Sequence, residues 1–191
     1  MSNPMNKFEI VILAIALVLN SLSVYIGAGI ILAREAYGRK AIFGSIMFVV
    51  QFLMVGAGIW IGYKMGSYAM QTNMIISVCI LVIFGLNVLL TNINANSRDE
   101  VPDFTNNSVI VLAALAEGIT PLSIGIAFGL VSLQLVNQWL LTGVIMLVGI
   151  ISGISLGSRL GSNSRKLRFG PVGGLLILAV AIKLIINMMG F

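Results

Sequence analysis

The sequence contains no histidine and a single cysteine, Cys79, among its 191 residues. Without histidine it cannot build a Ser-His-Asp triad or a zinc site of the Cys/His type, and one cysteine cannot form a disulfide framework. Charged residues are also scarce, at 9%, whereas a soluble domain has about a quarter of its residues charged. We therefore expect neither an enzyme nor a resident cofactor, and an exterior that does not face water.

Apolar residues are abundant instead, at 59% with a mean hydropathy of +1.07. Such a composition predicts that the exterior of the protein is covered by lipid. The net charge of +5 could indicate a polyanionic partner, but the basic residues lie in short segments between apolar runs. Membrane topology explains them better, so we expect no nucleic-acid partner.

Six apolar stretches are long enough to cross a hydrocarbon core of ~30 Å. They fall at 8–33, 41–63, 73–91, 108–133, 139–160 and 171–190. Because backbone groups in lipid must be paired within their own segment, these stretches predict helices rather than strands. The expected fold is therefore an all-α membrane protein with six transmembrane helices.

The basic residues orient these helices. Eight of them fall on one side of the predicted bundle and only two, Lys7 and Lys64, on the other. The eight are Arg34, Arg39, Lys40, Arg98, Arg159, Arg165, Lys166 and Arg168. The excess of positive charge on cytoplasmic loops predicts a multi-pass protein of the cytoplasmic (inner) membrane with both termini outside.

The two halves of the chain resemble each other. Residues 22–29 match residues 122–129 at an offset of 100, and residues 59–67 match residues 154–162 at an offset of 95. We interpret residues 1–92 and 108–191 as two three-helix repeats joined by a cytoplasmic linker, residues 93–107. An odd number of spans inverts the second repeat in the membrane, an arrangement that is typical of transporters with a substrate site near mid-membrane.

Glycines recur every fourth residue in the second and fifth spans. They are Gly58, Gly62 and Gly66 in one span, and Gly149, Gly153, Gly157 and Gly161 in the other. Such spacing indicates close helix packing. A sliding surface for alternating access is the alternative interpretation.

Polar side chains occur deep in several spans, where they are costly and default to functional hypotheses. The candidate substrate-binding residues are Asn20, Ser23, Gln51, Glu117, Thr120, Ser123 and Lys183. For the serines, a structural hydrogen bond to a neighbouring helix is the competing explanation.

Spacing groups some of these residues into a site. Glu117 and Thr120 share one helix face, and the repeat makes Asn20 equivalent to Thr120, so both are expected at the centre. Pro121 removes one helical hydrogen bond and frees a carbonyl near residue 117. With Gln51 these groups form an oxygen-rich set suited to hard or borderline divalent cations.

Lys183 has three interpretations. Its side chain can extend to the outer interface, pair with Glu117, whose depth in the membrane differs by only about 5 Å, or contact the substrate. Pairing with Glu117 would compete with a cation for the carboxylate.

The chain resembles the bacterial manganese efflux pump (MntP) family, within the lysine-exporter-type superfamily. The resemblance rests on Ser-Val-Tyr-Ile-Gly-Ala-Gly at residues 23–29 and Pro-Leu-Ser-Ile-Gly-Ile-Ala at residues 121–127. It implies that family acids thought to hold the metal correspond to Asn20, Gln51 and Thr120. This chain therefore lacks those acids, and Glu117 is positioned to compensate.

The leading hypothesis is a secondary transporter that exports Mn²⁺ or another divalent cation by alternating access, with Asn20, Gln51, Glu117 and Thr120 as metal ligands. Its expected partners are the lipid bilayer and a small cation or polar solute. One alternative is an exporter of a small organic solute such as an amino acid. The other is a non-transporting accessory membrane protein with a decayed centre, in which Lys183 neutralises Glu117.

Overall fold

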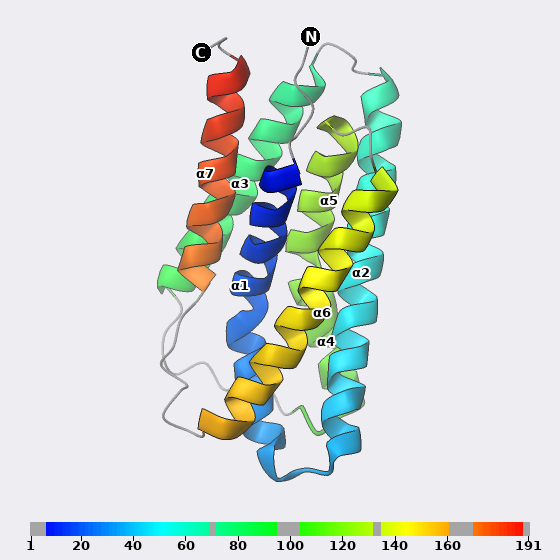
Figure 1. Cartoon of the computed structure of the whole chain (residues 1–191), viewed down its shortest axis with the longest axis vertical. Coiled ribbons are helices and arrows are strands. Elements are labelled where there is room, and N and C mark those ends of the chain that lie inside the picture. The colour runs from blue at the N-terminus through cyan, green and yellow to red at the C-terminus, as the bar shows by residue number, and fades with distance from the viewer. Residues whose placement is uncertain (1–6, 69–71, 95–103, 132–134, 161–169, 189–191) are drawn as a thin grey trace.

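The computed structural model of the chain describes residues 7–68, 72–94, 104–131, 135–160 and 170–188. In these ranges the structure is helical, and six helical segments are long and apolar enough to cross a membrane. The prediction of six transmembrane helices is therefore confirmed. Both ends of the described chain lie at the same end of the bundle (Figure 1).

The first three spans are α1 (Lys7–Ile31), α2 (Tyr37–Tyr68) and α3 (Asn73–Asn94). A short 3₁₀ helix, η1 (Leu32–Arg34), ends the first span. The second span is longer at both ends than the apolar run 41–63 indicates. Polar end residues such as Arg39 and Lys64 continue the helix beyond its apolar centre.

The remaining spans are built from α4 (Asn107–Glu117), α5 (Ile119–Val131), α6 (Leu135–Leu160) and α7 (Gly170–Met188). Asn106 caps α4, because its side-chain oxygen accepts a hydrogen bond from the Ser108 N–H at 3.0 Å. Much of the predicted linker, residues 95–103 with Arg98, lies outside the described residues, as do Gly161, Arg165, Lys166 and Arg168. Phe104 is buried and packs edge-to-face on Phe43 with ring centroids 5.1 Å apart.

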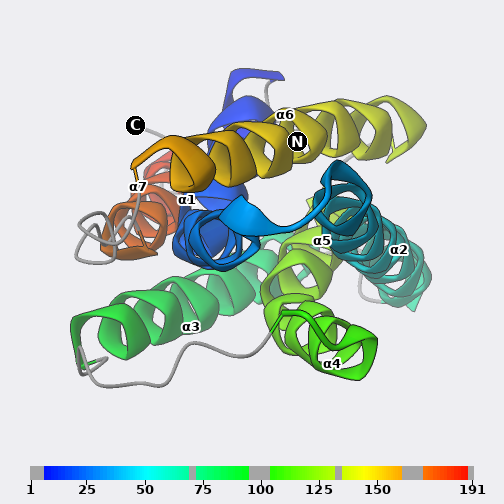
Figure 2. The ribbon, with the colours of Figure 1, turned by 90° about the horizontal axis from the view of Figure 1, so that it is seen from below.

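Helices α1 and α5 lie toward the middle of the bundle (Figure 2). Helix α1 packs mainly against α6 and α7, whereas α5 packs mainly against α2 and α3. The outward faces carry large apolar side chains such as Leu53, Leu112 and Val148, each about three-fifths exposed. Such faces are stable in lipid and would be costly in water.

Glycine contacts bring two helix pairs together. A Cβ on Gly62 would collide with the carbonyl oxygen of Ile126 and lie 3.0 Å from Gly129 Cα, and a Cβ on Gly29 would lie 3.0 Å from Gly157 Cα. Here only glycine lets the backbones approach this closely. The structural interpretation of the glycine spacing therefore holds at α2–α5 and at α1–α6.

Candidate functional site

The fourth span is interrupted where its acidic residue lies. Helix α4 ends at Glu117, and α5 begins at Ile119 after the single residue Gly118. Pro121 lies in the first turn of α5, where a missing N–H is tolerated. Its missing N–H is the one that would bond to the Glu117 carbonyl in a continuous helix, so the predicted loss of helical pairing agrees with the observed interruption.

The Glu117 carboxylate points to α1, where the Ser21 hydroxyl donates a hydrogen bond to its Oε2 at 2.6 Å. One turn further along α1, the Tyr25 hydroxyl donates to Gln51 Oε1 on α2 at 2.7 Å. Tyr25 is also within side-chain hydrogen-bonding reach of Ser21, whereas its interaction with Glu117 is electrostatic only. Ser21, Tyr25, Gln51 and Glu117 thus form one polar cluster that joins α1, α2 and α4.

The polar groups of this cluster are largely shielded from solvent, which makes an unpaired group among them costly. Gln51 is 1% exposed, and its Nε2 lacks a hydrogen-bond partner. Tyr25 is likewise 1% exposed, and Ser21 is buried. A buried polar group without a partner costs free energy, so such a group in a membrane helix marks a place where something else can bind.

Of the predicted site residues, the structure connects Gln51 and Glu117, through α1. Asn20 and Thr120 are partly buried, and the backbone of Asn20 lies against Gly173 on α7. Their meeting at the centre stays a prediction. Ser123 donates to the Ile119 carbonyl at 2.8 Å, the structural use expected of a helix serine. The hydroxyl of Ser23 is buried and has no partner.

Lys183 contacts a residue that the sequence analysis did not consider. Its Nζ lies 2.8 Å from Oε1 of Glu9 on α1. The side chain of Glu9 is 4% exposed and that of Lys183 is 50% exposed. Lys183 is thus paired with Glu9 and not with Glu117, which contradicts the alternative in which it neutralises the central carboxylate.

The candidate residues predicted from the sequence omitted Ser21, Tyr25 and Glu9. Glu9 lies in the first apolar run, so the rule that identified Glu117 would have found it. Tyr25 is four residues after Ser21, and this spacing places both hydroxyls on one helix face. Within the described ranges, no three Asp, Glu, Cys or His side chains come together as a metal site. A cation at this cluster would therefore meet one carboxylate.

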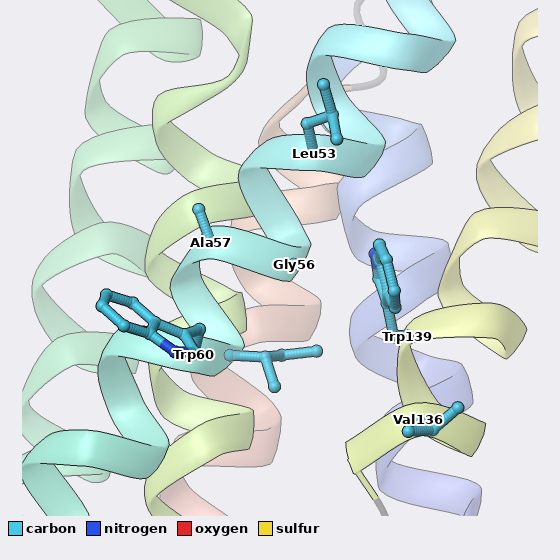
Figure 3. A pocket seen from close by; sticks show the side chains of 7 residues that line it. Leu53, Gly56, Ala57, Trp60, Val136 and Trp139 are labelled. Atoms are coloured by element: carbon cyan, nitrogen blue, oxygen red, sulfur yellow. The ribbon is translucent and has the colours of Figure 1, made fainter.

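A groove of about 510 Å³ lies between α2 and α6, lined by Leu53, Gly56, Ala57, Ile59, Trp60, Val136 and Trp139 (Figure 3). Trp139 stacks on Phe52 with centroids 4.5 Å apart, and its indole N–H donates to the Phe52 carbonyl at 2.9 Å. The lining is apolar, and the indole N–H of Trp139 is already hydrogen-bonded. The groove provides no cation ligand, so the polar cluster is the better candidate site.

The chain is similar to known proteins over nearly its whole length. A family model described as "Putative manganese efflux pump" matches residues 34–185. A Clostridium botulinum protein named "Putative manganese efflux pump MntP" is 26% identical and covers 96% of each chain. A Methanobrevibacter smithii protein of that name is 25% identical over 94% of this chain and 96% of its own.

A third relative, from Bacteroides thetaiotaomicron and with the same name, is 27% identical over 96% of this chain and 97% of its own. No solved structure matches. The family model covers far more than half of the chain, and the expected resemblance is confirmed. The protein is a multi-pass membrane protein that belongs to the MntP family, whose members are named as manganese efflux pumps.

Proposed function

We propose that this chain is a secondary transporter that exports a divalent cation, with Mn²⁺ the first candidate, by alternating access at the Ser21–Tyr25–Gln51–Glu117 cluster. The proposal rests above all on Glu117, a partly buried carboxylate in the fourth span that accepts a hydrogen bond from Ser21 at 2.6 Å. Ionisable groups at such depths face a bundle interior or pathway and mark ion routes. The choice of Mn²⁺ as the first candidate cation comes from the names of the relatives.

The packing of the glycines supports an inverted repeat. The placement of both termini on the outer side rests on the basic residues between the spans. Offsets of 100 and 95 residues make Gly29 equivalent to Gly129 and Gly62 equivalent to Gly157. Gly29 lies against Gly157, and the equivalent residues Gly129 and Gly62 lie against each other. The two contacts are therefore related by the repeat. A pseudo-twofold axis between two halves is the architecture that lets one half rock against the other.

A second candidate function is favoured by one observation. The unpartnered group of Gln51 is an N–H donor, and a donor suits a carboxylate or carbonyl oxygen of an organic solute. An amino acid could place its ammonium group on Glu117 and its carboxylate on Gln51. By contrast, the decayed-centre hypothesis required Lys183 on Glu117, and Lys183 is on Glu9 instead.

Flux in proteoliposomes tests the leading proposal. Glu117→Gln keeps the shape of the side chain and removes its charge, so Mn²⁺ flux should fall by at least about tenfold, the equivalent of one charge-assisted interaction. Glu35→Gln makes the same chemical change at an exposed position and should leave flux unchanged.

Equal flux in Glu117→Gln and the unchanged protein would remove Glu117 from the mechanism. Thermal shifts with a panel of metals and of amino acids then separate the two candidate functions. A shift with amino acids and none with metals would favour the organic solute.

A further inference from the structure

The Gln51 side chain uses only one of its two polar atoms. Its Oε1 accepts the hydrogen bond from Tyr25 at 2.7 Å, while its Nε2 is buried without a hydrogen-bond partner. An amide nitrogen is a donor and cannot ligate a cation, whereas the amide oxygen can. In this arrangement, therefore, Tyr25 holds the atom of Gln51 that a cation needs.

Rotation of the amide by 180° about its last bond would exchange the two atoms with little change of shape. Nε2 would then donate to the oxygen of the Tyr25 hydroxyl, which accepts as well as donates. Oε1 would become available as a ligand. The buried donor that lacks a partner in the present arrangement would gain one.

The rotated amide requires Tyr25 to send its own proton elsewhere. The Ser21 hydroxyl lies within side-chain hydrogen-bonding reach of Tyr25. Ser21 donates its own proton to Glu117, and a hydroxyl oxygen can accept as well as donate. A Tyr25 hydroxyl that rotates from Gln51 to Ser21 therefore finds an acceptor without movement of a helix.

We propose that Tyr25 is a positioning residue that sets the orientation of the Gln51 amide, holding Oε1 in the arrangement seen here and accepting from Nε2 when a divalent cation takes Oε1. This proposal rests on the cation-transport function proposed above. With the cation in place, Oε1 contacts the cation, Nε2 donates to Tyr25, Tyr25 donates to Ser21, and Ser21 still donates to Glu117. Every polar atom of Gln51 is then paired, and the same chain of bonds connects α2, α1 and α4.

The sequence of hydrogen bonds explains how a site with one carboxylate recruits a second oxygen ligand. The amide oxygen has two lone pairs, and rotation leaves both of them to the cation. Rotation is favoured when the cation offsets the loss of the bond from Tyr25. A cargo without positive charge at this position gains nothing from the rotation, so the relay contributes to selectivity for cations.

Infrared difference spectroscopy of the full chain in lipid nanodiscs, with and without Mn²⁺, tests the relay. Tyrosine labelled with ¹³C at the ring carbon that bears oxygen reports whether a hydroxyl only donates or also accepts. We expect Mn²⁺ to shift this band in the unchanged protein. The shift should persist in the control Tyr63→Phe, because Tyr63 is 57% exposed and lies outside the cluster. Tyr25→Phe should abolish the shift.

Mn²⁺ affinity provides a second readout. Tyr25→Phe should weaken binding about tenfold, because the bound state loses two hydrogen bonds and the unbound state one. In transport assays the KM should rise more than the maximal rate falls. Gln51→Met, a variant of similar shape, should also abolish the tyrosine band shift, which guards against misfolding of Tyr25→Phe.

The outcomes separate this proposal from the proposed function. Mn²⁺ binding with no tyrosine band shift, or unchanged affinity in Tyr25→Phe, overturns the relay and leaves cation transport standing. Absence of any Mn²⁺-dependent thermal shift in the unchanged protein overturns both. A band shift produced by an amino acid instead of Mn²⁺ overturns the assignment of the relay to a cation.

Discussion

Two hydroxyl groups on α1, those of Ser21 and Tyr25, donate the hydrogen bonds that orient Glu117 and Gln51. Ser21 donates to a carboxylate, and such charge-assisted hydrogen bonds are roughly twice as strong as neutral ones. Tyr25 donates to a neutral amide. Since both hydroxyls lie on one helix, a small rotation of α1 would change the partners of Gln51 and Glu117 together.

Ser21→Ala removes one hydrogen bond to Glu117 and leaves the carboxylate in place. We expect Mn²⁺ flux in proteoliposomes to fall about tenfold or more, since one hydrogen bond to a charged group contributes about 1.5–3 kcal/mol. The loss should be smaller than in Glu117→Gln, because the carboxylate keeps its charge. The control is Ser67→Ala, because Ser67 is exposed and its hydroxyl donates to the Lys64 carbonyl at 2.7 Å within α2, away from Glu117. Equal losses in both variants would contradict a specific role for Ser21.

Close backbone contact is the feature that defines the helix pairs. At the α2–α5 pair, a Cβ on Gly58 or on Gly62 would collide with carbonyl oxygens of α5. Backbone atoms cannot turn aside as a flexible side chain can, so the helices themselves would have to separate. This contact positions Gln51 on α2 relative to the interruption between α4 and α5.

Gly62→Ala should therefore lower the thermal stability of the protein in nanodiscs, with a cost of about 1–3 kcal/mol from overpacking. Gly38→Ala is the matched control, because nothing lies within 4 Å of a Cβ at that position. It should leave the unfolding temperature unchanged or slightly higher, since alanine favours helix. Equal unfolding temperatures for the two variants would show that the contact at Gly62 is not tight.

The ion pair between Glu9 and Lys183 joins the first and last helices of the whole molecule. The side chain of Glu9 is 4% exposed, whereas that of Lys183 is 50% exposed. A buried charge that loses its partner is costly, but an exposed one can be solvated. Removal of Lys183 and removal of the Glu9 charge should therefore lower the stability of the protein by different amounts.

Lys183→Met should destabilise the protein more than Glu9→Gln does, by roughly 1–3 kcal/mol, because it leaves a buried carboxylate without its cation. The double variant should resemble Glu9→Gln alone. Unfolding in lipid, followed for all four proteins, gives the comparison. If Glu9→Gln is the more damaging variant, the carboxylate has another partner whose loss matters more.

The amino-acid sequence by itself determined the membrane class, the six spans and the presence of polar residues within them. Each of these follows from local composition, because a run of apolar residues must be helical in lipid wherever it packs. Glu117 and Gln51 were also identifiable, since a polar group in such a run is conspicuous. Tyr25 was not, because its ring reads as apolar and its hydrogen bond is made only across helices.

Tertiary structure decided which polar groups meet. Lys183 was placed at a depth that allowed contact with Glu117, yet the packing of α7 on α1 brings it to Glu9. Depth along a helix follows from the rise per residue, whereas the direction in which a side chain points across the bundle depends on how neighbouring helices are rotated. That rotation is set by contacts such as Gly173 of α7 with Asn20 of α1, between residues far apart in the chain.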